Sequence, residues 1–484
     1  MSKFLLNQHL VEEDLPDSAI VLDIIRHRRG LTGTKEVCRE GDCGACQVLL
    51  GKQIDGHLQY QSVNACLLPL GAVAGSHVVT IEGINSEQLN PIQQALVTNG
   101  AIQCGFCTPG LVMALTGFFL VNPESDERAA VDAVAGNLCR CTGYSGIKRA
   151  IKQLCNQFDL SRSAMPQRID DLIQWQILPA YFLTVTQTLT TLSSCNHSNP
   201  APDSVLVAGG TDLFVQKPER VHSQSLHFLI PAPAIENIRY ENQQCIIKAT
   251  TTIEQMRTSP LMQQLFPAIA EDFKLICSAP IRQRATVGGN LVNASPIADL
   301  AIFFLALDGR LIIASGKKRR TVALKHFFQT YKQVDLQPGE QVLEILFDKS
   351  TTRYFSYEKV SKRTYLDIAS VNSALSIQLT DGRIETAHIA AGGVAAIPFY
   401  LTKTCAYLEG KTIEPATILE AAEIAQSEVA PISDSRGSAQ YKCLLLRQLI
   451  FAHFLKLFPE TVNWELLNTQ NINKQYGHSC STSL

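Results

Sequence analysis

The stretch Cys38-Arg-Glu-Gly-Asp-Cys43-Gly-Ala-Cys46 decides the fold of the first part of this chain. Its C-x4-C-x2-C spacing, with a further cysteine downstream, is the plant-type ligand pattern of a [2Fe–2S] cluster. Gly41 and Gly44 let the loop curl so that backbone N–H groups face the sulfurs. Free buried cysteines and zinc are the alternatives, but zinc sites favour paired C-x2–4-C knuckles. We therefore expect one [2Fe–2S] cluster on the metal ligands Cys38, Cys43, Cys46 and Cys66.

A second cysteine constellation lies further along, where Cys104-Gly-Phe-Cys107 is followed by Cys139-Arg-Cys141. Each pair comes just before a predicted helix, capped by Thr108 or Ser145, and a helix N-terminus favours an anionic cluster. Zinc remains an alternative, because C-x2-C with a second pair also suits it. The C-x-C pair would strain a tetrahedral zinc site, so we favour a second [2Fe–2S] cluster on the metal ligands Cys104, Cys107, Cys139 and Cys141.

Composition limits the class of protein. The chain has 484 residues, 46% of them apolar, and a net charge of −2, so it is long enough for several cores and gives no support to nucleic-acid binding. The apolar stretches 111–121 and 300–307 are too short to cross a membrane. The apolar run near the start of the chain is shorter than a secretory signal requires. We therefore expect a soluble, cytoplasmic protein with reduced thiols, in which clustered cysteines bind metal.

The remaining cysteines show no ligand spacing. We expect Cys155 and most of the six later ones to be small buried residues of the cores; the six are Cys195, Cys245, Cys277, Cys405, Cys443 and Cys480.

The pattern along the chain predicts several domains. A mostly β unit covers 1–85, with a short helix capped by Ser18 and ending at Gly30, and strands at 47–50 and 77–81. Helices near 91–98, 109–121, 126–135 and 145–157 form a helical domain over 86–157, and 158–180 is a linker. An α/β region over 181–350 precedes an α+β region over 351–457, in which a hairpin turns at Asp381-Gly382 and helices cover 416–427 and 438–457. The polar tail is 458–484.

Two glycine turns in the α/β region predict a phosphate site. Val207-Ala-Gly-Gly-Thr-Asp-Leu213 follows an apolar strand and precedes a helical pattern. A second glycine turn, Thr286-Val-Gly-Gly-Asn290, is followed by Ser295-Pro-Ile-Ala-Asp299. Backbone N–H groups in such turns can cradle phosphate. Either turn alone is weak evidence, because a plain turn has the same composition, and neither is a G-x-G-x-x-G motif. The basic run Lys317-Lys-Arg-Arg320 is best interpreted as a solvated hairpin end.

The cysteine motifs resemble a known family. EGDCGAC (40–46), NAC (64–66), QCGFCTPG (103–110) and NLCRCTGY (137–144) occur in the order seen in the molybdenum hydroxylases, the xanthine dehydrogenase and aldehyde oxidase group. The resemblance implies an α+β multidomain fold. Its parts are a β-grasp plant-type ferredoxin domain, a four-helix [2Fe–2S] domain, an α/β FAD-binding domain of the vanillyl-alcohol-oxidase-like (PCMH) type, and a C-terminal domain like that of CO dehydrogenase flavoproteins.

The resemblance also implies an FAD site, in which both glycine turns hold the pyrophosphate and Asp299 approaches the adenosine half. The loop 358–369 resembles the family's flavin-edge loop, but it carries Leu366-Asp367 where several relatives have two acidic residues, a change that bears on acceptor preference. The implied cofactor-binding residues are Leu206, Val207, Ala208, Gly209, Gly210, Thr211, Asp212, Leu213, Ile276, Thr286, Gly288, Gly289, Asn290, Asp299, Leu343 and Lys359.

The implied function is an electron relay with no catalytic acid–base residue in this chain. A large molybdopterin-binding partner holds the molybdenum cofactor and selects the substrate, a purine oxidised to urate. Electrons then pass through two [2Fe–2S] clusters to FAD and on to NAD, in a heterotetramer of two small and two large subunits. Fusion of the iron–sulfur and FAD parts favours a xanthine-dehydrogenase-type enzyme. The alternatives are a relay for aldehydes or other N-heterocycles, a stand-alone NADH-oxidising flavoprotein or assembly module, and a zinc scaffold.

Overall fold

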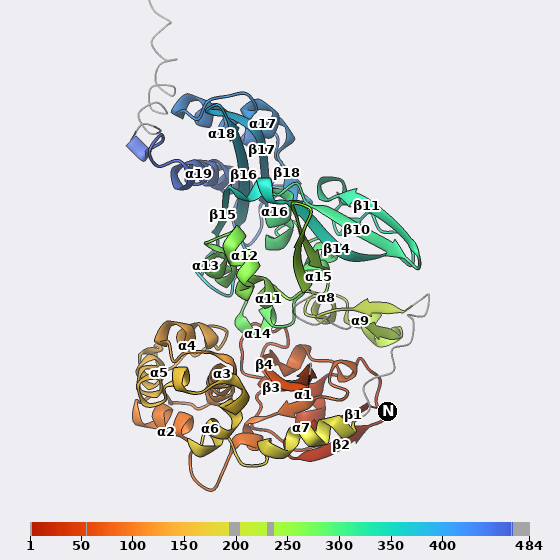
Figure 1. The fold of residues 1–484 in the computed structure, drawn as a ribbon, viewed down its shortest axis with the longest axis vertical. Coiled ribbons are helices and arrows are strands. Elements are labelled where there is room, and N and C mark those ends of the chain that lie inside the picture. The colour runs from red at the N-terminus through yellow and green to blue at the C-terminus, as the bar shows by residue number, and fades with distance from the viewer. Residues whose placement is uncertain (1, 55, 193–203, 230–236, 466, 468–484) are drawn as a thin grey trace, which may run out of the picture. The chain divides into compact units, whose positions relative to one another are not determined.

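The computed structural model describes residues 2–54, 56–192, 204–229, 237–465 and 467. The chain forms two compact units (Figure 1). The first unit is formed by described residues of the ranges 1–233, 252–254 and 277–285. The second unit is formed by described residues of the ranges 234–251, 255–276 and 286–484. The predicted tail lies largely outside the described residues, as do Cys195 and Cys480.

A five-stranded sheet opens the first unit. Its strands are β1 (Ser2–Leu6), β2 (His9–Glu13), β3 (Gln47–Ile54), β4 (His57–Asn64) and β5 (His77–Val79), in the order β2-β1-β5-β3-β4. The pair β1 and β5 is parallel, and the other pairs are antiparallel. Apolar residues such as Phe4, Leu22 and Val48 fill its core.

The predicted helix of this unit starts later than expected. Helix α1 (Val21–Asp23) continues into a π-helical turn (Ile24–Arg28), and Ser18 does not cap it. Ile20 is the N-cap residue because its extended backbone bridges to Pro69, so the helix begins only after it. Gly30 follows with φ +68°, as predicted for the C-terminal end.

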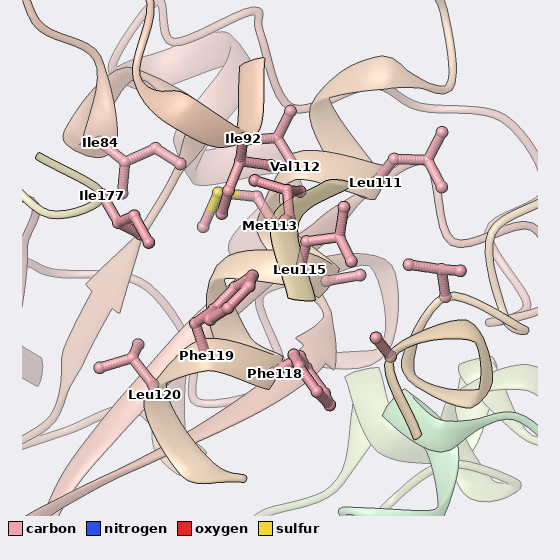
Figure 2. Packing of buried hydrophobic residues seen from close by; sticks show 14 of the residues in the cluster. Ile84, Ile92, Leu111, Val112, Met113, Leu115, Phe118, Phe119, Leu120 and Ile177 are labelled. Carbon is pink, nitrogen blue, oxygen red and sulfur yellow. The ribbon is translucent and has the colours of Figure 1, made fainter. Parts of the chain in front are cut away.

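The four predicted helices of the next region are confirmed as α2 (Pro91–Thr98), α3 (Thr108–Val121), α4 (Glu127–Ala133) and α5 (Ser145–Gln157). Helix α3 is apolar on all sides, and its Leu111, Leu115 and Phe119 are almost fully buried in the cluster that Figure 2 shows. Each such side chain contributes about 1.5–3 kcal/mol when it leaves water. Thr108 and Ser145 are the first residues of their helices rather than the caps, because the helices begin directly at the cysteine loops.

The residues predicted as a linker pack onto this helical region. They form two short 3-10 turns and helix α6 (Arg168–Gln174), and helix α7 (Phe182–Thr191) follows. Arg168 is buried and donates to the carbonyl oxygens of Phe119 and Asn122 at the C-terminal end of α3. It thereby satisfies carbonyl groups that a helix end leaves without partners.

The rest of the first unit surrounds the first glycine turn. Strand β6 (Val205–Val207) pairs in parallel with β7 (Leu226–Phe228), and the short helices α8 (Leu213–Gln216) and α9 (Pro218–Ser223) lie between them in the chain. Helix α14 (Ala279–Arg282) joins this unit from later in the chain.

The second unit contains an antiparallel sheet whose strands are β8 (Ile238–Glu241), β9 (Gln244–Lys248), β10 (Arg310–Ser315), β11 (Lys318–Ala323) and β14 (Gln341–Asp348). Their order is β11-β10-β14-β9-β8. Lys317 lies at the turn of the β10–β11 hairpin, and Arg320 pairs with Asp335 and Glu340, in agreement with the predicted hairpin end. A small hairpin pairs β12 (Phe328–Thr330) with β13 (Gln333–Val334).

Several short helices accompany this sheet in the chain. They are α11 (Ile253–Thr258), α12 (Pro260–Leu265), α13 (Ile269–Asp272), α15 (Val287–Asn293) and α16 (Asp299–Leu305). Helix α16 contacts strands of the following sheet.

A four-stranded antiparallel sheet completes the second unit, with the order β15 (Tyr354–Val360), β16 (Val371–Thr380), β17 (Arg383–Gly392), β18 (Phe399–Tyr400). Helices α17 (Thr402–Leu408), α18 (Pro415–Ser427) and α19 (Ala439–Leu457) share one apolar core with it. The predicted hairpin turn is confirmed, since Asp381 and Gly382 both have positive φ, as a tight two-residue turn requires. Within the described residues, no helix has the length and hydropathy that a membrane span needs.

Candidate functional site

The first set of cysteines converges where the long loop before β3 meets the 3-10 turn after β4. The thiol of Cys38 contacts those of Cys43 and Cys66, and the thiol of Cys46 also contacts that of Cys66. Cys46 and Cys66 are buried, whereas Cys38 and Cys43 are half-buried. The structure therefore brings together the four thiols that the sequence predicts as one ligand set.

Crowding makes these thiols unequal acids. Contact with Cys43 and then Cys66 lowers the pKa of Cys38, whereas contact with Cys38 and Cys46, followed by burial, raises the pKa of Cys66. Contact with Cys38, followed by burial, also raises the pKa of Cys43. Four thiolates cannot share such a space without a cation, and bound iron removes the conflict because metal ligation deprotonates thiols.

The loop between these cysteines depends on Gly44. Its φ is +69°, and a Cβ there would lie 2.4 Å from the carbonyl oxygen of Gly136. Any side chain would therefore push the second cysteine region away. Gln47, next to the ligand Cys46, is buried, and its Nε2 donor has no partner among the described residues. An unpaired donor beside the thiols fits a site whose acceptors are cluster and ligand sulfurs.

The second set of cysteines forms two close pairs, each with one thiol from either loop. The Sγ atoms of Cys141 and Cys104 are 3.5 Å apart, and the thiols of Cys107 and Cys139 are also in contact. Burial raises the pKa of Cys107 to about 12. Cys139 is held further by Thr142, whose Oγ1 is 3.2 Å from its Sγ.

The spacing of the thiols distinguishes iron–sulfur from zinc. Four thiolates on one zinc ion would all lie about 3.8 Å apart, as Zn–S bonds of about 2.3 Å in a tetrahedron require. Among the described residues, the one set of three donor atoms that all lie within 4.8 Å of one another is Asp23, His27 and Glu36, which contains no cysteine. In the second set the contacts fall into two separate pairs, which suit two metal ions, one pair to each ion. The spacing of that set therefore fits a two-iron cluster better than a single zinc ion.

The two cysteine sets are joined through backbone. The N–H of Leu138, which precedes Cys139, donates to the carbonyl oxygen of Cys43 at 3.0 Å. The Nδ2 of buried Asn137 donates to the carbonyl oxygen of Gly44 and to Oε1 of Gln47, both at 3.0 Å. One ligand from each set thus lies within one residue of a shared hydrogen bond. The sequence did not reveal this contact, because its partners are about 90 residues apart.

The two sets differ in exposure. Cys104 and Cys141 are exposed, and the neighbouring Phe106 and Tyr144 are 46% and 38% exposed. Large apolar side chains in water beside a ligand loop are typical of surfaces that meet another macromolecule. The second set therefore lies at the surface of the first unit, whereas half of the first set is buried.

The first glycine turn belongs to the first unit. Gly210 has φ +75°, a conformation that only glycine adopts without strain. A Cβ on Gly209 would lie 2.0 Å from the carbonyl oxygen of Arg284, so two chain segments meet closely there. Among the described residues, no acceptor takes the N–H groups of Gly209, Gly210 and Thr211. Such donors suit an anion.

The second glycine turn belongs to the second unit. Thr286 caps helix α15, and its Oγ1 accepts from the N–H of Gly289 at 3.1 Å. Gly288 donates to the carbonyl oxygen of Ala249 at 2.8 Å, and a Cβ on it would meet the Ala249 Cβ at 2.6 Å. The Oδ1 of Asn290 is buried without a partner among the described residues. The two turns lie in different units, and each forms a tight turn with an unsatisfied polar group.

Asp299 and Lys359 are predicted to contact FAD, but the structure pairs them with each other. The Lys359 Nζ lies 2.9 Å from Oδ2 of Asp299 and also donates to the carbonyl oxygen of Leu275. Oδ1 of Asp299 accepts from the Tyr357 hydroxyl at 2.7 Å and from Asn372 Nδ2 at 2.6 Å. Because the Lys359 side chain is 2% exposed, this network holds helix α16 against β15 and β16. The sequence did not identify Tyr357 or Asn372.

The other residues predicted for the flavin site lie in the following places. Ile276 is buried and directly follows Leu275, and Leu343 lies in β14, where its carbonyl oxygen accepts from Ala249. In the predicted flavin-edge loop, Leu366 is buried with φ +57°, and Asp367 accepts from the N–H of Arg363. The unusual Leu366 therefore packs inward and presents no charge.

The remaining cysteines follow the prediction in part. Cys245 and Cys405 are buried, whereas Cys155, Cys277 and Cys443 are only partly so. Burial raises the pKa of Cys155 to about 11, which keeps its thiol protonated.

Three family models match the chain. Residues 80–152 match a [2Fe–2S] binding domain, residues 181–347 match the FAD binding domain in molybdopterin dehydrogenase, and residues 356–457 match the CO dehydrogenase flavoprotein C-terminal domain. These matches cover both glycine turns and the second cysteine set.

Curated relatives and a solved structure are also similar. Xanthine dehydrogenase/oxidase of Rattus norvegicus is 29% identical over 81% of this chain and 34% of its own, and xanthine dehydrogenase of Emericella nidulans is 28% identical over 86% and 35%. The chain thus spans about a third of the length of these relatives. A chain of carbon monoxide dehydrogenase from Hydrogenophaga pseudoflava is 26% identical, with a TM-score of 0.50 over 54% of this chain and 92% of its own.

Proposed function

The chain carries the iron–sulfur and FAD-binding domains of the molybdenum hydroxylase family, and on that premise we propose that it is the electron-transfer subunit of a xanthine dehydrogenase. A partner subunit holds the molybdenum cofactor and oxidises hypoxanthine or xanthine to urate, and this chain relays the electrons to NAD. The observation that carries the proposal is the pair of thiol sets joined through Leu138 and Cys43. When bound, two [2Fe–2S] clusters and FAD would supply one- and two-electron transfer.

Three contacts within the first unit support an order for the proposed relay. Cys104 and Cys141 are exposed, so the second set can receive electrons from a partner. The hydrogen bond from Leu138 to Cys43 then connects it to the first set. Ile281 packs on the loop of the first set, because a Cβ on Gly41 would lie 2.6 Å from its Cδ1. Ile281 is three residues from Arg284, which contacts the first glycine turn, so the chain continues towards the proposed flavin site.

The choice of xanthine as substrate rests on the similar proteins. The similar proteins named above include xanthine dehydrogenases and a carbon monoxide dehydrogenase. In the proposal the substrate binds to the partner subunit and not to this chain. The fused iron–sulfur and FAD regions resemble the xanthine enzymes along most of this chain, which favours xanthine. The second candidate is the same relay in an enzyme for aldehydes or other N-heterocycles.

Cofactor content and partner identity test the proposal. Eight ligand thiolates predict about four irons and about one FAD per chain, with the visible spectrum of an iron–sulfur flavoprotein. Affinity purification from the native host should recover a larger, molybdenum-containing subunit, and a substrate panel on that complex should show purine oxidation with NAD reduction. Zinc in place of iron would overturn the relay. A complex that oxidises aldehydes but no purine would favour the second candidate.

A further inference from the structure

Arg284 is a partly buried arginine at the first glycine turn. It follows helix α14 in the first unit, and its Nη2 donates to the carbonyl oxygen of Gly209 at 2.8 Å. Its Nε is buried and has no partner among the described residues. Burial lowers the pKa of Arg284 to about 10, which still leaves the guanidinium charged at neutral pH.

No carboxylate of the described residues pairs with Arg284. The contrast with Arg282, two residues earlier, is direct: its Nε lies 2.8 Å from Oε2 of Glu254, and its Nη1 donates to the carbonyl oxygen of Cys277. Partly buried charges are ordinarily paired, because an unpaired one loses hydration without compensation. Arg284 therefore carries a positive charge that no carboxylate of the described residues neutralises.

The hydrogen bond from Arg284 also sets the direction of a peptide group. All described peptide bonds are trans, so the carbonyl of Gly209 and the N–H of Gly210 point to opposite sides. Because that carbonyl faces Arg284, the N–H of Gly210 faces away from it. The N–H groups of Gly209 and Thr211 are also without an acceptor among the described residues. The turn thus presents N–H donors with a positive charge behind it, which is an arrangement for an anion.

We propose that Arg284 is a positioning residue and counter-charge for the pyrophosphate of FAD: it orients the Gly209–Gly210 peptide and attracts the anion across it. The inference rests on the proposed FAD site and adds a residue outside both glycine turns. Arg284 need not touch the cofactor, since its charge acts through a peptide group in a partly dry environment.

Two substitutions of Arg284 distinguish the effect of its charge from the effect of its shape. Arg284→Lys keeps the positive charge, whereas Arg284→Gln keeps an amide donor but removes the charge. The full chain is stripped of FAD, and FAD rebinding is followed by quenching of flavin fluorescence at about 20 and about 500 mM KCl. We expect Arg284→Gln to weaken FAD binding at low salt by about tenfold or more and to lose most of the salt dependence. Arg284→Lys should stay within about threefold of the unsubstituted chain and keep the salt dependence.

Arg220→Gln is the matched control. It removes one positive charge from an exposed arginine of α9 in the same unit, whose side chain bonds to Gln224. We expect it to bind FAD as the unsubstituted chain does. Wild-type affinity and salt dependence in Arg284→Gln would overturn the inference, and so would equal losses in the lysine and glutamine variants with unchanged salt dependence. An unsubstituted chain that binds no FAD would instead overturn the proposed function, and the inference with it.

Discussion

The thiol of Cys141 is exposed and lies 3.5 Å from that of Cys104, so its loss tests one ligand set with little damage to the fold. Serine is a poor ligand for iron, which prefers the softer thiolate. We expect Cys141→Ser to lose the second cluster and to keep the first cluster and FAD. Electron flow from substrate to flavin should collapse, whereas NADH should still bleach the flavin. Electron paramagnetic resonance and stopped-flow absorbance measure the two effects.

The control for this substitution is Cys155→Ser, because Cys155 lies outside both ligand sets. It should keep about four irons per chain. Normal electron flow from substrate to flavin in Cys141→Ser would show that the proposed order of the relay is wrong.

Two buried imidazoles predict acid sensitivity. Burial lowers the pKa of His453 to about 3 and that of His77 to about 4. In the unfolded chain each imidazole takes up a proton near pH 6.5, whereas in the folded chain it stays neutral to a lower pH. The free energy of unfolding is therefore highest above pH 6.5 and falls as the pH approaches the pKa values of the folded protein. The loss is about 2 kcal/mol per ring between pH 6.5 and pH 5. We expect His453→Gln to reduce the slope of urea-unfolding stability against pH over this window.

The two imidazoles are held differently. His77 Nε2 donates to the carbonyl oxygen of Asn7, which can only accept, so its Nδ1 accepts from the Tyr60 hydroxyl. His453 has one partner, Ser356, and its Nε2 has none among the described residues. Exposed His57 provides the control, and His57→Gln should leave the slope unchanged. An unchanged slope in His453→Gln would contradict the argument.

At the scale of elements, Gly44 tests the junction of the two ligand loops. Gly44→Ala adds a Cβ 2.4 Å from the carbonyl oxygen of Gly136, at φ +69°. Gly30 has φ +68° with no atom within 4 Å of its Cβ position, so Gly30→Ala has the backbone strain without the clash. We expect Gly30→Ala to cost about 1–2 kcal/mol and keep its iron. Gly44→Ala should also lose iron, which a colorimetric assay measures, and equal iron in both variants would contradict the role of the junction.

Local signals predicted many of the elements, and the cysteine motifs predicted which thiols meet, but other contacts between distant residues were not predicted. Helices α2 to α5 and the hairpin at Asp381-Gly382 are predicted by residues close to them in the chain, and their positions are confirmed. The contacts of Asn137 with Gly44, and of Arg284 with Gly209, join segments 93 and 75 residues apart, and no periodicity encodes them. The pairing of Asp299 with Lys359 was missed for the same reason. The ligand residues themselves remain predictions that the thiol contacts support.

At the scale of the whole molecule, the proposed function predicts that this chain performs one part of the reaction and that a proposed partner subunit performs the other. In the proposal this chain holds the FAD that passes electrons to NAD, but it does not hold the molybdenum site that takes electrons from the substrate. Prepared alone with its cofactors, it should transfer electrons from NADH to an artificial dye and should not oxidise xanthine. Adding the molybdenum subunit should restore xanthine oxidation with NAD reduction. Steady-state assays of the isolated chain and the reconstituted pair, side by side, measure both activities.

Two further results would test this division of labour. Xanthine turnover by the isolated chain, free of bound molybdenum, would place the chemistry on this polypeptide. Protection of the exposed Phe106 region from proteolysis or labelling by the larger subunit would support docking at the second ligand set. Equal accessibility of that region in the isolated chain and in the pair would contradict it.

The exposure of Cys104 and Cys141 has a practical consequence for the durability of the protein. When iron leaves their site, both thiols face water with their sulfurs 3.5 Å apart, close enough for oxidation to join them in a disulfide. The first set is more protected, since Cys46 and Cys66 are buried. During storage in air the second site should therefore lose its iron first. The disulfide should then prevent iron from binding there again until a reductant is added. Paired measurements of iron and titratable thiols over days of storage would reveal this sequence, and earlier loss from the first site would contradict it.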